Sequence, residues 1–390
     1  MFRPNPAPST ANLIAFNFLL IAFLTGIASA FQTPTLSLFL SQELQVSPFL
    51  VGLFYAVNAL IGIVLSQILA RYSDRLPDRR QVMIFCCLIA VLGCLLFAFN
   101  RNYYILILVA TTLLGLGSAA NPQSFALARE YAESSGRETV MFTTIMRTQI
   151  SLAWIVGPPL SFFIALNWGF DYLYLVSAGA FLLCALVSRL LPQVPRRQTG
   201  TQVSNEPHKS PRKSVTYLFI ANLLLWTCNS MYLINMPLFV IHELHLDKEL
   251  AGTLMGTAAG LEIPIMLFAG WLSRYWAKKN LMLAALIAGL LFYCGMSMAE
   301  QTWQLVALQL LNAIFIGITA TIGMVYFQDL MPEQMGSATT LFSNAAKSSW
   351  VLGGPIAGLI AEYWSYQSVL YIALGLIAIS LLCMSKVKSV

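Results

Sequence analysis

Three charged side chains stand inside long apolar runs of the chain, and they are the residues whose chemistry most needs an explanation. They are Arg147, Glu262 and Lys347. A charge at the centre of a bilayer costs roughly 2.5 kcal/mol or more, so each is expected to face a partner or a polar cavity. Arg147 and Lys347 are 200 positions apart, which predicts equivalent places in an internal repeat.

Neutral polar side chains recur inside the same runs. Two sets have the i, i+4, i+7 spacing of one helical face: Arg147, Ser151 and Trp154, and Asn222, Trp226 and Asn229. Further amides are Asn58, Asn312 and Asn344, the last of them beside Lys347. Amides paired with indole rings suit an uncharged, polyhydroxylated ligand. Hydrogen bonds that join neighbouring helices are the alternative explanation for any one of them.

The residue types and their spacing do not favour metal binding or catalysis. The stretch His242-Glu243-Leu244-His245 is one residue short of the zinc-protease spacing, which needs both histidines on one helical face. The seven cysteines all lie in apolar stretches and have no metal spacing. We expect no metal, no cofactor and no catalytic residues, and therefore no enzyme.

The elements that position these side chains follow from composition. Of the 390 residues, 58% are hydrophobic and only 10% are Asp, Glu, Lys or Arg, against about 25% in soluble domains. Such a surface must face lipid, and a spanning helix needs roughly 20 apolar residues. Twelve runs qualify, at roughly 12–40, 48–70, 81–99, 103–127, 138–166, 171–191, 215–241, 249–273, 280–299, 303–328, 337–362 and 367–385. The sequence predicts an all-α polytopic membrane protein.

The hydrophilic stretch 192–214 reads as a cytoplasmic linker between two six-helix bundles, 1–191 and 215–390. If both termini are cytoplasmic, the cytoplasmic loops and tails hold 18 of the 22 Lys and Arg residues. The opposite loops then hold only Arg101 and Lys248. The net charge of +6 thus reports membrane topology, and its scatter over short turns argues against a nucleic-acid partner.

A shift of 200 residues brings the two halves into register at several landmarks. The matched pairs are Leu38-Phe39 with Leu238-Phe239, Glu43-Leu44 with Glu243-Leu244, Gly52 with Gly252, and Gly136, Thr139 and Phe142 with Gly336, Thr339 and Phe342. A parallel repeat of six spans predicts two pseudo-symmetric bundles with a central site, opened alternately to each side.

The loop after the second run, Ala70 to Arg80, contains Asp74-Arg75 and the basic pair Arg79-Arg80. Asp74 can accept hydrogen bonds at a helix N-terminus, and Arg75, Arg79 and Arg80 can pair with acids at neighbouring helix ends, such as Glu130 and Glu133. Such contacts would gate the cytoplasmic side; a generic positive-inside turn is the alternative. The repeat-related stretch, Gly270 to Lys279, has Arg274 in place of the acid, which leaves an equivalent second latch in doubt.

This loop resembles the signature of the major facilitator superfamily. Gly157-Pro158-Pro159 and the stretch Gly353 to Gly358 add small residues and prolines that let helices approach closely. Over nearly its whole length, including Thr33 to Leu40 and Asn121 to Glu130, the chain resembles the bacterial sugar efflux transporters of that superfamily.

That resemblance implies export of mono- and disaccharides and sugar analogues such as lactose, glucose and thiogalactosides, through a monomer in the inner membrane with protons as coupling partner. It makes the fifth and eighth spans neighbours, which suggests an Arg147–Glu262 pair. Glu262 would either exchange a proton during transport or form a static ion pair. The substrate-binding candidates are Asn58, Arg147, Trp154, Asn222, Trp226, Asn229, Asn312, Asn344 and Lys347. A proton-coupled multidrug exporter of the same fold is the alternative.

Overall fold

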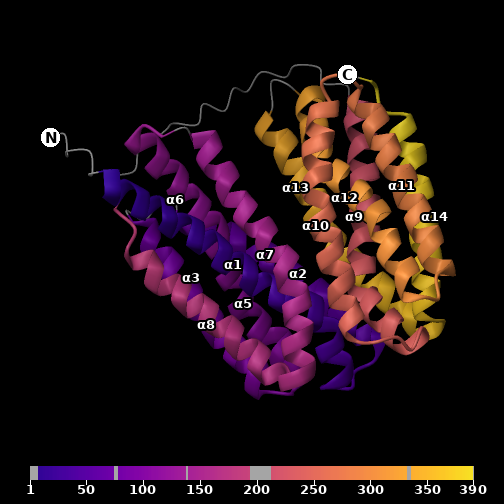
Figure 1. Cartoon of the computed structure of the whole chain (residues 1–390), viewed down its shortest axis with the longest axis horizontal. Coiled ribbons are helices and arrows are strands. Elements are labelled where there is room, and N and C mark those ends of the chain that lie inside the picture. Colours follow the sequence, from indigo (N-terminus) through magenta and orange to yellow (C-terminus); the bar gives the residue numbers. More distant parts are fainter. Residues whose placement is uncertain (1–7, 74–77, 138, 194–211, 332–334, 390) are drawn as a thin grey trace. The chain divides into compact units, whose positions relative to one another are not determined.

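The computed structural model describes residues 8–73, 78–137, 139–193, 212–331 and 335–389, and among these residues it contains helices and no strand (Figure 1). The first half has α1 (Pro8–Gln42), α2 (Pro48–Ser73), α3 (Arg79–Phe99), α7 (Thr139–Trp168) and α8 (Phe170–Arg189). Its fourth segment has four parts: α4 (Tyr103–Ile105), η1 (Leu106–Ala110), α5 (Thr111–Ser118) and α6 (Ala120–Ser135).

The second half repeats this order. It comprises α9 (Arg212–Leu238) with its continuation η2 (Phe239–Glu243), α10 (Glu249–Leu272), α11 (Lys278–Met298), α12 (Thr302–Leu330), α13 (Met335–Tyr363) and α14 (Tyr366–Ser385). The described chain thus forms twelve helical segments, as predicted. Several run beyond the predicted ends, because a helix does not have to stop where the hydrocarbon layer ends.

Eleven of the described segments are long and apolar enough to cross a membrane. The segment α13 is long enough, at 29 residues, but it is not one of these eleven. Its middle carries Asn344, Lys347 and several serines, which lower its mean hydropathy. A helix of this kind is stable in a bilayer when its polar face is turned away from lipid.

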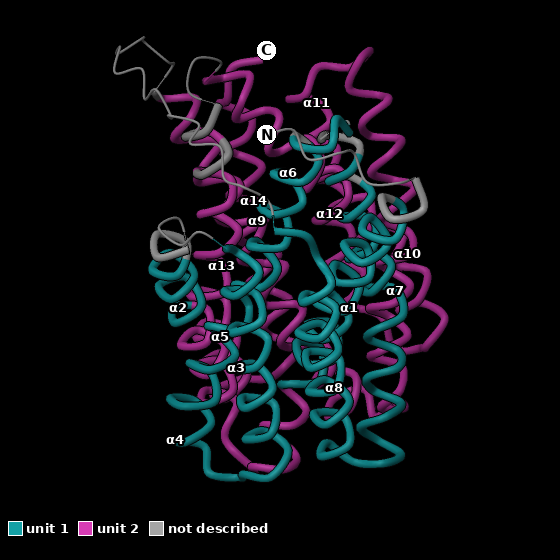
Figure 2. Tube along the Cα trace, turned by 90° about the vertical axis from the view of Figure 1, so that its left-hand side faces the viewer, with its two compact units in different colours: residues 1–36, 60–202 teal, residues 37–59, 203–390 magenta. Residues whose placement is uncertain are grey.

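The chain divides into two compact units (Figure 2). Unit 1 comprises residues 1–36 and 60–202, and unit 2 comprises residues 37–59 and 203–390. The end of α1 and the beginning of α2 therefore belong to unit 2, although the rest of both helices belongs to unit 1. The division at a linker over 192–214 stays a prediction.

The internal repeat is visible in the backbone of two loops. Gln45, between α1 and α2, has a φ of 52°, and His245, between η2 and α10, has a φ of 53°. These are the two non-glycine residues with positive φ among the described residues, and they are 200 positions apart. A residue other than glycine is strained in this conformation, so its recurrence at both places indicates that the two loops have the same structure.

The hydrogen bonds around these loops match as well. The Leu44 N–H donates to the Phe39 carbonyl, and in the second half the Leu244 N–H donates to the Phe239 carbonyl. Likewise, the Val46 N–H donates to the Leu40 carbonyl, and the Leu246 N–H donates to the Val240 carbonyl. The spacing of 200 residues that the sequence suggests is thus a repeat of structure.

Aromatic rings fill the interior of each unit. In unit 1, Phe18 lies 5.4 Å from Tyr131 and 5.7 Å from Phe142, measured between ring centroids. In unit 2, Tyr232 lies 5.1 Å from Phe292. The outward faces expose Leu, Ile, Val and Phe side chains along most helices, as a surface in contact with lipid requires.

Candidate functional site: polar clusters at helix ends and inside unit 2

The N-terminus of α3 is joined to the C-terminal end of α6 by an ion pair. Arg79 Nε lies 2.8 Å from Glu130 Oε1, and Arg79 also donates to Gln123 Oε1 at 2.9 Å. Both charged side chains are mostly buried, with 13% and 22% of their surface exposed. The sequence predicts Glu130 as a partner for the arginines of this loop, and Arg79 makes that contact.

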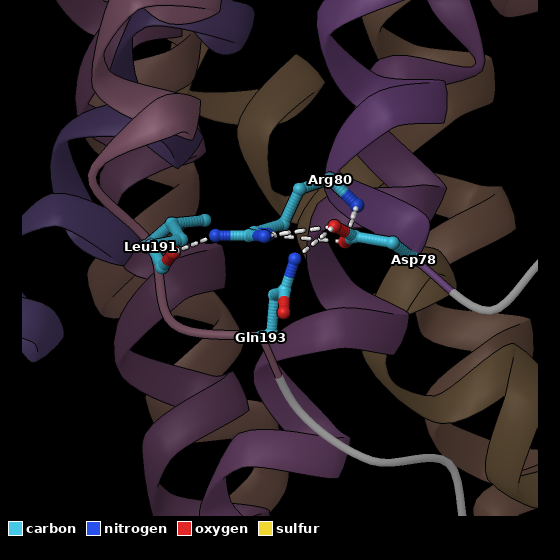
Figure 3. A network of polar contacts seen from close by, with 4 residues as sticks. All are labelled: Asp78, Arg80, Leu191 and Gln193. Atoms are coloured by element: carbon cyan, nitrogen blue, oxygen red, sulfur yellow. Dashed lines mark hydrogen bonds and ion pairs between the residues drawn. The ribbon is translucent and has the colours of Figure 1, made fainter.

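Arg80 behaves differently from that expectation. It binds Asp78 through Nε and Nη2 and donates from Nη1 to the Leu191 carbonyl at 2.6 Å (Figure 3). Asp78 caps α3 by accepting from the Arg80 N–H, and Gln193 donates to the same carboxylate. The Arg80 hydrogen bond is the main reason that the pKa of Asp78 lies below its usual value.

The helix-capping carboxylate in this region is therefore Asp78. Asp74 and Arg75, named as gating residues from the sequence, lie outside the described residues. Arg79 and Arg80 together fasten the start of α3 to the ends of α6 and α8, all within unit 1.

The second half has the same arrangement with different residues. Lys278 forms an ion pair with Asp329, and each lies 199 positions after its counterpart, Arg79 and Glu130. Lys279, the counterpart of Arg80, donates from Nζ to the Ser385 carbonyl at 2.6 Å. Arg274 leaves a second latch in doubt because it stands in place of the loop acid. These contacts do not need that acid, because Asp329 on α12 provides the carboxylate.

A seam of small residues joins α2 to α13 inside unit 2. A Cβ atom added to Gly354 would lie 2.3 Å from the Gly52 carbonyl oxygen, and one added to Gly358 would lie 2.5 Å from the Pro48 carbonyl oxygen. Real Cβ atoms do not come this close, so the two backbones touch because both helices have glycine there.

The seam continues in both directions along α13. Tyr55 stacks on Trp350 with ring centroids 5.9 Å apart, and Glu362 Oε2 accepts the Phe49 N–H at 2.8 Å. Trp350, Gly354, Gly358 and Glu362 are spaced at four-residue intervals, which places them along one face of the helix. The glycines were noticeable in the sequence, but nothing in their pattern indicated that α2 was the partner.

Two predicted ligand-binding residues on α9 have polar atoms without hydrogen-bond partners among the described residues: Asn222 Oδ1 and Trp226 Nε1. Asn222 is fully buried, and its Nδ2 donates to the Leu218 carbonyl at 2.9 Å. The Trp226 ring meets Phe342 edge to face at 6.2 Å between centroids. A buried acceptor and a nearby buried donor are thus available one helical turn apart.

Asn312 belongs to a second buried polar group of unit 2. Its Nδ2 donates to Gln309 Oε1 at 3.1 Å, the Tyr232 hydroxyl donates to the same oxygen at 3.3 Å, and Asn312 Oδ1 is unpartnered among the described residues. Asn58 and Asn229 are half-buried, and Asn344 and Lys347 on α13 are exposed. Among the described residues, no hydrogen bond joins Asn58, Asn229, Asn344 or Lys347 to the Asn312 group.

The remaining candidates lie in different units. Arg147 of unit 1 is exposed, and its guanidinium lies 5.9 Å from the centroid of the Phe125 ring. Trp154 is half-buried, two turns further along α7. Glu262 is half-buried on α10 of unit 2. The Arg147–Glu262 pair stays a prediction. Among the described residues, no group of three or more His, Cys, Asp or Glu could hold a metal ion.

Comparison with solved structures identifies the fold. The nucleoside transporter NupG superposes with a TM-score of 0.79 at 16% sequence identity, covering 96% of this chain and 100% of that one. Likeness at this identity shows that the two chains share a fold. The family model of the Major Facilitator Superfamily matches residues 18–299 and again 218–388, from starting points 200 positions apart.

Sequence relatives narrow the assignment. Sugar efflux transporter A of Dickeya chrysanthemi is 53% identical over 380 residues, covering 97% of both chains. Sugar efflux transporter B of Salmonella typhimurium is 49% identical over 385 residues, covering 98% of both. The chain therefore belongs to the sugar efflux transporter family of the Major Facilitator Superfamily, as its sequence resemblance suggested.

Proposed function

We propose that this protein exports small sugars and sugar analogues, such as lactose, glucose and thiogalactosides, from the cytoplasm. The observation that carries the proposal is the identity of 53% and 49% to proteins named sugar efflux transporters, over nearly the whole of each chain. Matches of this extent cover every helix, so they include whatever residues select the cargo. The protein would act as a monomer in the inner membrane with both termini in the cytoplasm.

The unpartnered atoms of unit 2 support a cargo with hydroxyl groups. Asn222 Oδ1 can accept a hydrogen bond and Trp226 Nε1 can donate one, and a sugar hydroxyl can do both. A site built to bind hydroxyl groups rejects ligands that lack them, because its own polar atoms are then left unpaired. Asn58, Trp154, Asn229, Asn312, Asn344, Lys347 and Arg147 are the further candidates for substrate contacts.

Alternating access is the mechanism we propose for the two predicted bundles, 1–191 and 215–390, joined by the linker 192–214. The α2–α13 seam supports it, because its glycine contacts, one hydrogen bond to a carboxylate and one aromatic pair form a narrow contact that can part without unfolding either helix. The contacts of Arg79, Arg80, Lys278 and Lys279 would keep each bundle rigid while the seam opens and closes. Asp74 and Arg75 would complete the cytoplasmic gate.

Proton antiport is the proposed energy source, with Glu262 as the carboxyl group that exchanges the proton and Arg147 as its partner in one state. An ionised acid inside a spanning helix is energetically costly, so such residues are rare and mark functional sites. The test is efflux of labelled sugars from preloaded membrane vesicles, with and without a pH gradient. We expect lactose and glucose efflux to accelerate with the gradient, and Glu262→Gln to abolish that acceleration.

The same vesicles separate the alternatives. Efflux of cationic dyes without efflux of any sugar would refute sugar export and support the multidrug exporter. Sugar efflux that ignores both the pH gradient and the Glu262→Gln change would refute proton coupling while leaving the cargo assignment intact.

Movement at the seam has its own test. Cysteines replacing Phe49 and Glu362, in a background where Cys294 and Cys383 are serine, can be joined by a short bifunctional reagent that a reductant cleaves. We expect crosslinking to stop efflux and the reductant to restore it. Full efflux in the crosslinked protein would show that the seam stays closed throughout transport.

A further inference from the structure

The C-terminal end of α10 exposes a group of large apolar side chains that the transport proposal does not use. We call it the α10 aromatic end; it consists of Leu267, Phe268, Trp271, Tyr275 and Trp276, each between 51% and 72% exposed. Phe268 stacks on Trp271 at 5.7 Å between ring centroids, and Trp271 lies 5.1 Å from Tyr275. Phe268, Trp271 and Tyr275 thus form a continuous row of rings.

Hydrogen bonds of the main chain fix the loop that follows. The Arg274 N–H donates to the Trp271 carbonyl, and the Tyr275 and Trp276 N–H groups both donate to the Leu272 carbonyl, at 2.9 to 3.2 Å. Arg274 is exposed and lies between Trp271 and Tyr275 in sequence, within this tight turn. The turn therefore carries one exposed arginine between exposed aromatic residues.

Arg274 has no acidic residue near it in the sequence. Residues 263–299 contain Arg274, Lys278 and Lys279 but no Asp or Glu. Lys278 is paired with Asp329, and Lys279 binds the Ser385 carbonyl. Within the part of the chain that the structure describes, the Arg274 side chain has no ion pair or hydrogen bond.

The two halves of the repeat differ in sequence in this loop. The residues 200 positions before Trp271, Arg274, Tyr275 and Trp276 are Arg71, Asp74, Arg75 and Leu76. The second half thus has three aromatic residues and one arginine where the first has an acid, two arginines and a leucine. Lys278 and Lys279, 199 positions after Arg79 and Arg80, keep the contacts at the start of α11, so those contacts do not require the aromatic residues.

We propose that the α10 aromatic end and Arg274 form a docking site for the headgroup of an anionic phospholipid, such as phosphatidylglycerol, in the surrounding leaflet. Trp and Tyr at helix ends favour the headgroup region, because their rings are apolar and their N–H and O–H groups need a polar partner. The guanidinium group binds phosphate oxygens through two parallel hydrogen bonds. The lipid phosphate supplies a negative charge for Arg274, whose side chain has no ion pair among the described residues.

The test is native mass spectrometry of the purified, delipidated full-length protein titrated with phosphatidylglycerol or phosphatidylcholine. We expect Arg274→Gln to weaken the first phosphatidylglycerol bound by about fivefold, the effect of one basic residue near anionic headgroups. Arg274→Lys should fall in between, because it keeps the charge and loses the bidentate geometry. The matched control is Arg189→Gln, an exposed arginine at the end of α8 with no aromatic residue near it in sequence.

Three outcomes would overturn the proposal. One is equal phosphatidylglycerol affinity for the wild type and Arg274→Gln, and another is an equal loss in Arg189→Gln. The third is a protein dimer that the triple change of Trp271, Tyr275 and Trp276 to Ala dissociates, since the surface would then bind a second copy. Because the assay counts bound lipid and needs no sugar, its result is independent of the transport proposal.

Discussion

Replacement of Gly354 by Ala gives the sharpest test of the seam between α2 and α13. The new Cβ atom would lie 2.3 Å from the Gly52 carbonyl oxygen and 3.2 Å from both the Gly52 carbonyl carbon and Tyr55 Cβ. To reach even 3.0 Å from that oxygen, the helices must separate by roughly 0.7 Å. A helix backbone cannot rotate away as a flexible side chain can, so the substitution raises the free energy of the closed seam.

Overpacking of this kind costs about 1–3 kcal/mol, which corresponds to a shift of roughly 5- to 150-fold toward the open seam. If transport requires closure, efflux should fall by at least about fivefold. The matched control is Gly375→Ala on α14, where a Cβ meets nothing within 4 Å. Both changes raise helix propensity equally, so their difference isolates the contact.

The assay pairs sugar efflux from preloaded vesicles with the thermal unfolding midpoint of each purified variant. We expect Gly375→Ala to match the wild type in efflux, and Gly354→Ala to be folded but slow. Equal efflux for the two variants would refute the view that the glycine contact is needed for closure. An unfolded Gly354→Ala protein would instead be compared through Gly358→Ala, whose contact with Pro48 is slightly longer.

Three further predictions concern single side chains. Glu130→Gln should lower the thermal unfolding midpoint, because hydrogen bonds to charged groups contribute about 1.5–3 kcal/mol to stability. The same change at the exposed Glu300 should leave the midpoint unchanged. An equal effect of both changes would contradict a stabilising role of the Arg79–Glu130 pair. Because the pKa of Asp78 is depressed in the folded protein, its contribution to stability is present above its ordinary pKa and is lost as the pH falls through the folded value. The midpoint difference between wild type and Asp78→Asn should therefore be present at pH 7 and shrink below about pH 4, and a difference that grows with acid would reverse the sign of this reasoning. Trp226→Phe removes an unpartnered N–H, so it should leave the midpoint unchanged while raising the KM for sugar; a fall in the midpoint would indicate a structural role.

The helices could be predicted from sequence because lipid imposes a length and an apolar composition that few other structures share. The repeat was also visible, and the strained loops at Gln45 and His245 show why its landmarks recur. The ion pair of Arg79 followed from complementary charges at helix ends.

Contacts that involve main-chain atoms were not predictable in the same way. Arg80 binds the Leu191 carbonyl, and Glu362 binds the Phe49 N–H; every residue offers these groups, so no residue type identifies the partner. Arg274, in place of the acid of the first loop, leaves an equivalent second latch in doubt from sequence. The acid that pairs with Lys278, Asp329, lies about fifty residues away and matches Glu130 only at a spacing of 199 residues, one less than the spacing of the other landmarks.

The dividing line between the two units crosses α1 and α2 without interrupting either helix. Any motion of one unit against the other must therefore bend these two rods elastically or release their ends. Pro34 lies just before the crossing in α1 and has no N–H to lose, so bending there breaks no hydrogen bond of its own. Gly62 lies just after the crossing in α2, with open space where a Cβ would stand. Pro34 and Gly62 thus stand close to the two places where the chain passes from one unit to the other, and bending at these residues breaks the fewest contacts.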